Sequence, residues 1–149
     1  MPFRYEMEKE LTVLHKDLVK LGSLVETSID EMIEALINQD VDKAQGIIDR
    51  DDEIDDLTVK VEFDCVHLIA RQQPAASDLR DIASILNIAT DLERIADHCE
   101  DISKYVIELS KEEYFKPLVD IPKMAYAVKE MISMAVSSCI TKDLAITKR

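Results

Sequence analysis

Residues 82–101 read IASILNIATDLERIADHCED, and this stretch decides the fold class. Steps of four and three residues through it follow one face of a helix, which begins apolar and then includes acids: Ile82, Leu86, Ala89, Glu93, Ala96 and Glu100. The spacing predicts a long helix with this stripe toward a protein core. Because a buried carboxylate is costly unless it is compensated, the acidic positions indicate a partner for their charge.

A second stripe of the same kind lies upstream and also contains an aspartate: Ile47, Asp51, Ile54, Thr58, Val61, Cys65 and Leu68. Asp51 and Asp55 are four residues apart, as are Glu93 and Asp97, so the members of each pair are neighbours on one helix face. Two helices that each present an acidic pair suggest a shared cation held by carboxylate oxygens.

Asp101 extends the second acidic row by one turn. The alternative interpretation is a solvated acidic face on which Arg50 or Arg94 forms salt bridges with the carboxylates, and periodicity alone leaves both interpretations open. His98 points about 100 degrees away from Asp97 on an ideal helix, so we expect a surface position or a supporting hydrogen bond rather than ligation.

The remaining chain, with 2 glycines and 4 prolines, also reads as helix. A first helix is predicted over about residues 5–38, and a second, with Asp40 as its N-cap, up to about Gln73 before Pro74. A third runs to about Ser110, with Ser77 or Asp78 as its cap. The short connections predict an antiparallel, spectrin-like up-down bundle, and we interpret Arg71, Asp78 and Arg80 mainly as capping and local pairing at its second turn.

Residues 111–122 are charged and contain two prolines, which indicates a linker before a fourth helix that reaches about residue 140. A shift of 103 positions lays this helix on the first one, for example Val25 on Val128 and Ile29 on Ile132. We therefore expect an all-α chain with a three-helix unit at 1–110, a linker at 111–122, and at 123–149 the first helix and the start of the next helix of an incomplete second unit. The apolar stripe of the fourth helix predicts that it folds back on the first bundle or forms a homodimer.

The charge of −13 disfavours some classes of binding partner. It disfavours binding to nucleic acid and to anionic membranes, and no apolar run approaches the length of a membrane span. An N-terminus that carries Glu6, Glu8 and Glu10 is unlike a signal peptide, so we expect a cytoplasmic protein. Three widely spaced cysteines, Cys65, Cys99 and Cys139, lie in apolar stripes and are interpreted as reduced core thiols.

Two motifs stand out in this sequence, RQQPAASDLR at 71–80 and DLERIADH at 91–98. They resemble motifs of the PhoU family, the accessory regulators of bacterial phosphate-specific transport, and the likeness extends over essentially the whole chain. The resemblance implies two similar three-helix bundles and metal binding through motifs of the form E(D)xxxD. On this sequence these motifs are Asp51 with Asp55 and Glu93 with Asp97. Aspartate at position 101, where the family more often has asparagine, adds a carboxylate.

From the resemblance we expect a metal-binding adaptor that represses phosphate-starvation signalling by docking on the phosphate ABC transporter and on a sensor histidine kinase. The expected cofactors are divalent or trivalent metal ions, namely iron, zinc, magnesium or manganese, held by Asp51, Asp55, Glu93, Asp97 and Asp101. No catalytic role is expected, because no nucleophile stands at a recognisable spacing from a histidine base.

The alternative function is a di-iron carboxylate, ferritin-like oxidoreductase or a metal-storage protein. Its Glu-x-x-His pair is missing, because Ala96 stands three residues after Glu93. A purely structural helical module remains a third possibility.

Overall fold

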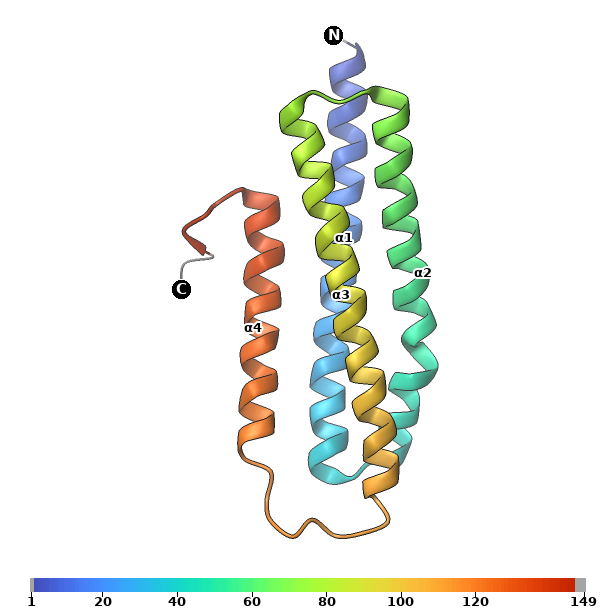
Figure 1. The fold of residues 1–149 in the computed structure, drawn as a ribbon, viewed down its shortest axis with the longest axis vertical. Helices are drawn as coiled ribbons and strands as arrows, with labels where there is room; N and C mark the ends of the chain where they lie inside the picture. The colour runs from blue at the N-terminus through green and yellow to red at the C-terminus, as the bar shows by residue number, and fades with distance from the viewer. Residues whose placement is uncertain (1, 147–149) are drawn as a thin grey trace.

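Residues 2–146 are described by the computed structural model, which contains four helices and, within this range, no strand (Figure 1). Helices α1, α2 and α3 form an antiparallel up-down bundle, and α4 lies beside it. Their bounds are α1 Pro2–Asn38, α2 Val41–Gln72, α3 Ala76–Leu109 and α4 Asp120–Thr141. The all-α helical bundle predicted from the sequence is confirmed.

The core of the bundle consists of one apolar stripe from each helix. On α1 the stripe keeps the four-three rhythm, with Leu14, Leu18, Leu21 and Val25 almost completely buried. On α2 the predicted stripe is confirmed: Ile47, Ile54, Thr58, Val61, Cys65 and Leu68 are buried, and Asp51 is half-buried. Burial of a leucine or valine side chain contributes about 1.5–3 kcal/mol, so these stripes hold the bundle together.

The buried line of α3 shares Ile82, Ala89 and Ala96 with the predicted stripe but differs from it at the alternate positions. The positions with the least exposure are Ile82, Ile85, Ala89, Leu92, Ala96, Cys99, Ser103 and Val106. Glu93 and Glu100 are half-buried at the edge of this face, beside Leu92 and Cys99. A helix that touches two neighbours buries a broad face, so apolar side chains occupy its centre and carboxylates its margin. The prediction that Glu93 and Glu100 face the core was therefore wrong by one position.

The turns confirm one predicted cap and correct another. Asp40 caps α2 by accepting a hydrogen bond from the Lys43 amide at 3.0 Å. Helix α3 begins earlier than predicted, with Ala75 as an N-cap that forms no side-chain hydrogen bond. Ser77 and Asp78 thus lie inside the first turn rather than before it, where the Asp78 charge is favourable beside the helix N-terminus.

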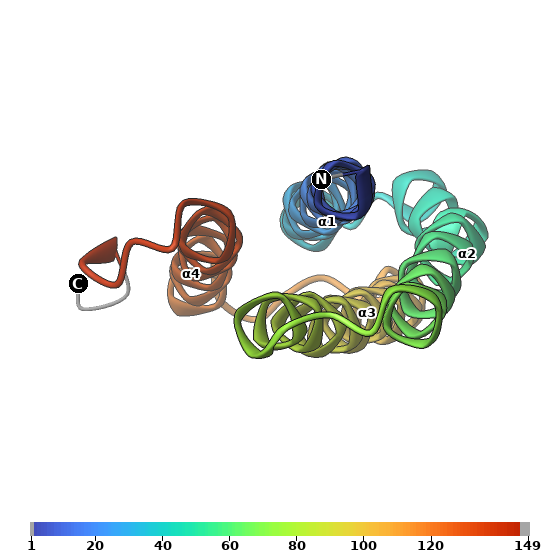
Figure 2. The same ribbon diagram turned by 90° about the horizontal axis from the view of Figure 1, so that it is seen from above.

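Helix α4 folds back on α1 and α3, one of the two arrangements expected from the sequence (Figure 2). It begins at Asp120, inside the predicted linker, because Pro122 lies in the first turn, where proline needs no amide donor. Ile132 and Val136 pack into the core. Gly22 of α1 permits this close approach, since a Cβ there would lie 3.2 Å from a methyl group of Val136.

Ion pairs also connect α4 to the bundle. Lys129 contacts Asp30 of α1 at 2.6 Å, and Lys142 contacts the buried Asp81 of α3 at 3.5 Å. The division of the chain into one complete and one incomplete repeat stays a prediction. Within residues 2–146, none of the helices has the length and apolar character that crossing a membrane requires.

Candidate metal centre

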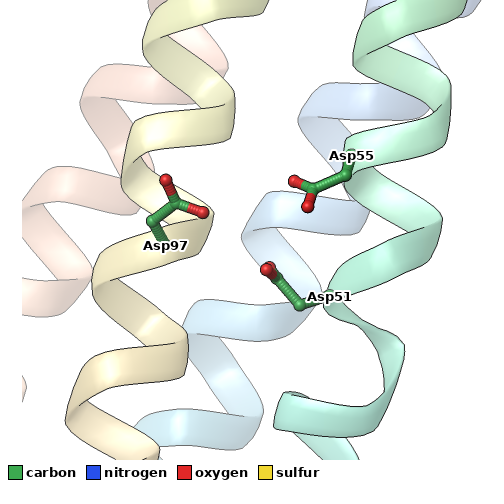
Figure 3. Close-up of side chains that lie close together, drawn as sticks. All are labelled: Asp51, Asp55 and Asp97. Atoms are coloured by element: carbon green, nitrogen blue, oxygen red, sulfur yellow. The ribbon is translucent and has the colours of Figure 1, made fainter.

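Three aspartates converge in the groove between α2 and α3. Asp51 and Asp55 project from α2, and Asp97 projects toward them from α3 (Figure 3). One carboxylate oxygen from each residue lies within 4.8 Å of those of the other two. This spacing would allow one small cation to contact all three side chains.

The local structure explains why these residues meet. Asp51 and Asp55 are one helical turn apart, and both adjoin the buried stripe of α2 that contains Ile54. Asp97 follows the buried Ala96 and so lies at the edge of the α3 face that packs on α2. Because α2 and α3 are antiparallel neighbours, their two margins meet and bring carboxylates of both helices together, along a line of contact between α2 and α3 that we call the groove.

Burial and mutual repulsion raise the pKa values of the carboxyl groups in this groove. The pKa of Asp51 rises to about 7, first because burial disfavours its charge and then because Asp55, Glu100 and Asp97 are close. The same two causes, burial first, raise the pKa of Asp55. The carboxylates of the groove therefore repel one another near neutral pH, and binding of protons or of a cation would reduce this repulsion.

One oxygen atom in the groove lacks any partner among the described residues. Oδ1 of Asp55 is buried and receives no hydrogen bond there. The arginines that a solvated acidic face would use contact other groups, since Arg94 pairs with Asp91 at 3.9 Å and Arg50 pairs with Glu31. A buried acceptor normally has a donor or a cation, so the donor set fits an oxygen-preferring metal ion.

The remaining predicted ligands occupy different positions. Glu93 is half-buried, and its pKa is raised by burial first and then by Asp55 and Asp97, so it lies near the three aspartates without joining them. Asp101 is exposed and lies 3.7 Å from Lys104 on its own helix. Asp101 therefore lies on an exposed side of α3, whereas Glu100 is beside Asp51 of α2.

Glu100 is a member of the groove that the sequence did not assign as a ligand. The pKa of Asp51 is raised by burial first, then by Asp55 and by the nearby Glu100. Lys104 contacts the carboxyl group of Glu100 at 3.0 Å. The sequence signal for Glu100 is its position seven residues, or about two helical turns, beyond Glu93 in the acidic part of the predicted α3 stripe.

The histidines and thiols stay outside the cluster of carboxylates. His98 is exposed and lines an apolar cavity of about 310 Å³ among α1, α3 and α4. Burial raises the pKa of Cys65 to about 11 and that of Cys99 to about 12, so both thiols are protonated at neutral pH. No histidine or cysteine joins the group formed by the described aspartates, which gives no support to a Glu-x-x-His di-iron site.

Comparison with known proteins gives a consistent result. Residues 18–106 match the model of the PhoU domain. The chain is 41% identical over 141 residues to a phosphate-specific transport system accessory protein PhoU homolog of Aquifex aeolicus, covering 95% of this chain and 64% of that protein. A homolog from Clostridium acetobutylicum is 39% identical, with 92% of this chain and 63% of that protein covered. The chain thus spans less than two thirds of the length of these relatives.

Solved structures show the same fold. The crystal structure of PhoU from Pseudomonas aeruginosa superposes with a TM-score of 0.88 at 32% sequence identity, covering 93% of this chain and 67% of that one. The phosphate transport system regulatory protein PhoU from Streptococcus pneumoniae gives a TM-score of 0.82 at 26% identity, covering 94% and 66%. The helical arrangement described above is shared with both.

Proposed function

The chain belongs to the PhoU family, and we propose that it is a metal-binding regulator of phosphate uptake. In this proposal it acts on the cytoplasmic side of the membrane as an adaptor rather than an enzyme. It docks on the phosphate ABC transporter and on the sensor histidine kinase of the phosphate response, and so represses starvation signalling. The names of its relatives, which describe accessory and regulatory proteins of phosphate transport, support the general role.

The convergence of Asp51, Asp55 and Asp97 supports the metal-binding part of the proposal. These residues would hold the cation, and Glu93 and Glu100 would supplement their negative charge. An all-oxygen set favours magnesium, manganese or iron over zinc, which prefers nitrogen and sulfur donors. The cation would neutralise the groove and link α2 to α3.

Metal binding is tested first on protein purified without chelator. Elemental analysis should find iron, manganese or magnesium, and calorimetric titration of chelated protein should show a site that Asp55→Asn weakens. Asp52→Asn is the matched control, because it removes the same charge from an exposed neighbour on α2. Equal affinities for the two variants would contradict the assignment of the groove.

Regulation is tested separately in cells. Tagged chain should co-purify with the transporter and the kinase, and deletion of its gene should raise a phosphate-starvation reporter in high phosphate. Restoring the chain should lower the reporter again. If deletion of the gene leaves the reporter signal unchanged and neither the transporter nor the kinase co-purifies, the regulatory proposal is wrong. This conclusion does not depend on what the groove binds.

Self-association is a further part of the proposal. Met124, Val128 and Met131 of α4 are exposed, and an uncovered apolar row favours contact with a second copy. Sedimentation of the chain should show a dimer that Met124→Glu with Met131→Glu dissociates. A wild-type monomer over the micromolar range would remove the homodimer from the proposal.

A further inference from the structure

One exposed face of α2 remains outside the groove and the core. It follows the helix in steps of three and four residues, and we call it the outer α2 face: Asp49, Asp52, Asp56, Val59, Phe63, Val66 and Ala70. All seven residues are exposed, and they lie opposite the buried stripe of the same helix. Figure 2 shows α2 at the margin of the bundle, on the side away from α4. The outer α2 face is therefore covered by no other described element.

The two halves of this face differ in chemistry. The first half presents three aspartates, and the second half presents Val59, Phe63 and Val66, which are 62%, 66% and 59% exposed. The Phe63 ring stacks on His67, with the ring centroids 5.7 Å apart and the planes inclined by 11°. A contiguous exposed row of large apolar side chains is typical of a protein-binding surface.

Among the residues that the structure describes, no cation neutralises the acidic half. Nearby cations are committed elsewhere, since Lys60 pairs with Asp17 at 2.6 Å and with Asp64 at 2.8 Å, and Arg50 pairs with Glu31. Within residues 2–146, Asp52 and Asp56 have no ion pair at all. This half thus attracts positive charge from outside the molecule.

We propose that the outer α2 face docks a basic amphipathic helix of a partner protein. Its apolar side chains would cover Val59, Phe63 and Val66, and Lys or Arg residues two to three turns away would pair with the aspartates. The face spans about 30 Å at 1.5 Å per residue, which matches a partner helix of about 20 residues. This inference rests on the proposed function only in one respect: the outer α2 face would be the surface through which the chain docks on a partner.

The negative charge of the outer α2 face disfavours two other binding partners, a second copy of the chain and an anionic membrane. A second copy could place one apolar half on another, but the aspartates of both copies would then lack positive partners. An anionic membrane would be repelled by the acidic half. A basic helix satisfies both halves at once.

The probe is a fluorescein-labelled synthetic helix of about 20 residues. It carries leucines at positions i, i+4 and i+7 and three lysines on the same face two turns further along. A second peptide has glutamate in place of each lysine. Fluorescence anisotropy against the full chain, with and without EDTA, should show binding of the lysine peptide at least tenfold tighter than that of the glutamate peptide. The difference should shrink as salt is added.

Variants of the chain locate the contact. Phe63→Asp and the double change Asp52→Lys with Asp56→Lys should each weaken binding of the lysine peptide at least tenfold. Two matched controls should stay within twofold of wild type. They are Tyr105→Asp on α3, an aromatic residue 61% exposed, and the pair Glu108→Lys with Glu130→Lys, which are exposed acids on α3 and α4. Circular dichroism melts verify that each variant is folded.

Three results would overturn the proposal. One is equal affinity for the two peptides, and another is binding that Phe63→Asp and the double variant leave unchanged. The third is a wild-type dimer in sedimentation that Phe63→Asp converts to a monomer, because the occupant would then be a second copy. The peptides contain no transporter or kinase sequence. Failure of the chain to co-purify with those two proteins would therefore overturn the proposed function, but it would not test whether the outer α2 face binds a basic helix.

Discussion

The two faces of α2 carry the same residue type one position apart, yet in different surroundings. Asp51 and Asp55 face α3 and are half-buried, whereas Asp52 and Asp56 face outward and are exposed. Repulsion from the outer pair contributes to the raised pKa of Asp55, but burial contributes more. Burial beside a second acidic helix, rather than acidity alone, therefore distinguishes a candidate metal site from a solvated acidic face.

The largest expected difference between these faces is in metal affinity. Asp51→Asn combined with Asp97→Asn should lower manganese affinity on the order of 100-fold, since two of three charged ligands are lost. Asp52→Asn combined with Asp56→Asn should lower it only about threefold, because exposed charges act through solvent. Calorimetry measures both in the same buffer. Similar losses of affinity in the two double variants would show that Asp51 and Asp97 are not the metal ligands.

The second difference concerns stability against pH in chelated protein. The folded-state pKa of Asp51, about 7, lies above the ordinary aspartate value of 3.8, so between these two values the folded protein retains a proton there that the unfolded chain releases. This contribution is most favourable below the lower value and is lost as pH rises toward 7. Asp51→Asn should therefore stabilise chelated protein at pH 8 by about 1 kcal/mol, a figure reduced for solvent screening, and by almost nothing near pH 4.

Urea unfolding at both pH values provides the check, with Asp52→Asn as the control. With saturating metal the sign should reverse, because the wild type then gains RT ln(1 + [L]/Kd), or about 2.7 kcal/mol at 100 times Kd. A stabilisation by Asp51→Asn that does not depend on pH would argue against the raised pKa.

A third, smaller difference is expected between two adjacent residues of α3. Glu100 lies beside Asp51, whereas Asp101 is exposed and contacts Lys104. Glu100→Gln should lower metal affinity about fivefold, and Asp101→Asn by less than twofold, because only the former charge faces the groove. The opposite order would favour Asp101, the ligand expected from the sequence, over Glu100.

The smallest effect is expected at His98. Its side chain lines the apolar cavity beside α4, so His98→Gln should change metal affinity by less than twofold, as a residue outside the coordination sphere would. Cobalt-substituted protein adds a spectroscopic readout, in which intense sulfur-to-metal charge-transfer bands should be absent. Their presence would show that a cysteine is a ligand and that its assignment to the core is incomplete.

The sequence predicted the fold well because the stripes of α1 and α2 are apolar at nearly every core position. On α3 it assigned Leu86, Glu93 and Glu100 to the core where Ile85, Leu92 and Cys99 are central, because both sets have the same seven-residue spacing. Periodicity alone does not distinguish two adjacent lines of a broad face. Only the packing against α1 and α2 fixed which line is central.

The candidate site was partly predictable for the same reason. Spacing by four placed Asp51 with Asp55, and the acidic run of α3 supplied Asp97. Whether Glu100 or Asp101 turns toward α2 depends on the rotation of α3, which spacing within one helix does not give. The unpartnered Oδ1 of Asp55 is a property of three-dimensional packing and has no counterpart in the sequence.

The three aspartates of the groove all belong to one helical hairpin, formed by α2, the turn at Gln73 and α3. Helices α1 and α4 contribute none of the three aspartates. The site can therefore assemble as soon as α2 and α3 pair. A cation held there would offset part of the chain entropy lost on closure, and it would do so early, before distant segments dock. Metal supply would then act on the rate at which the bundle folds as well as on its final stability.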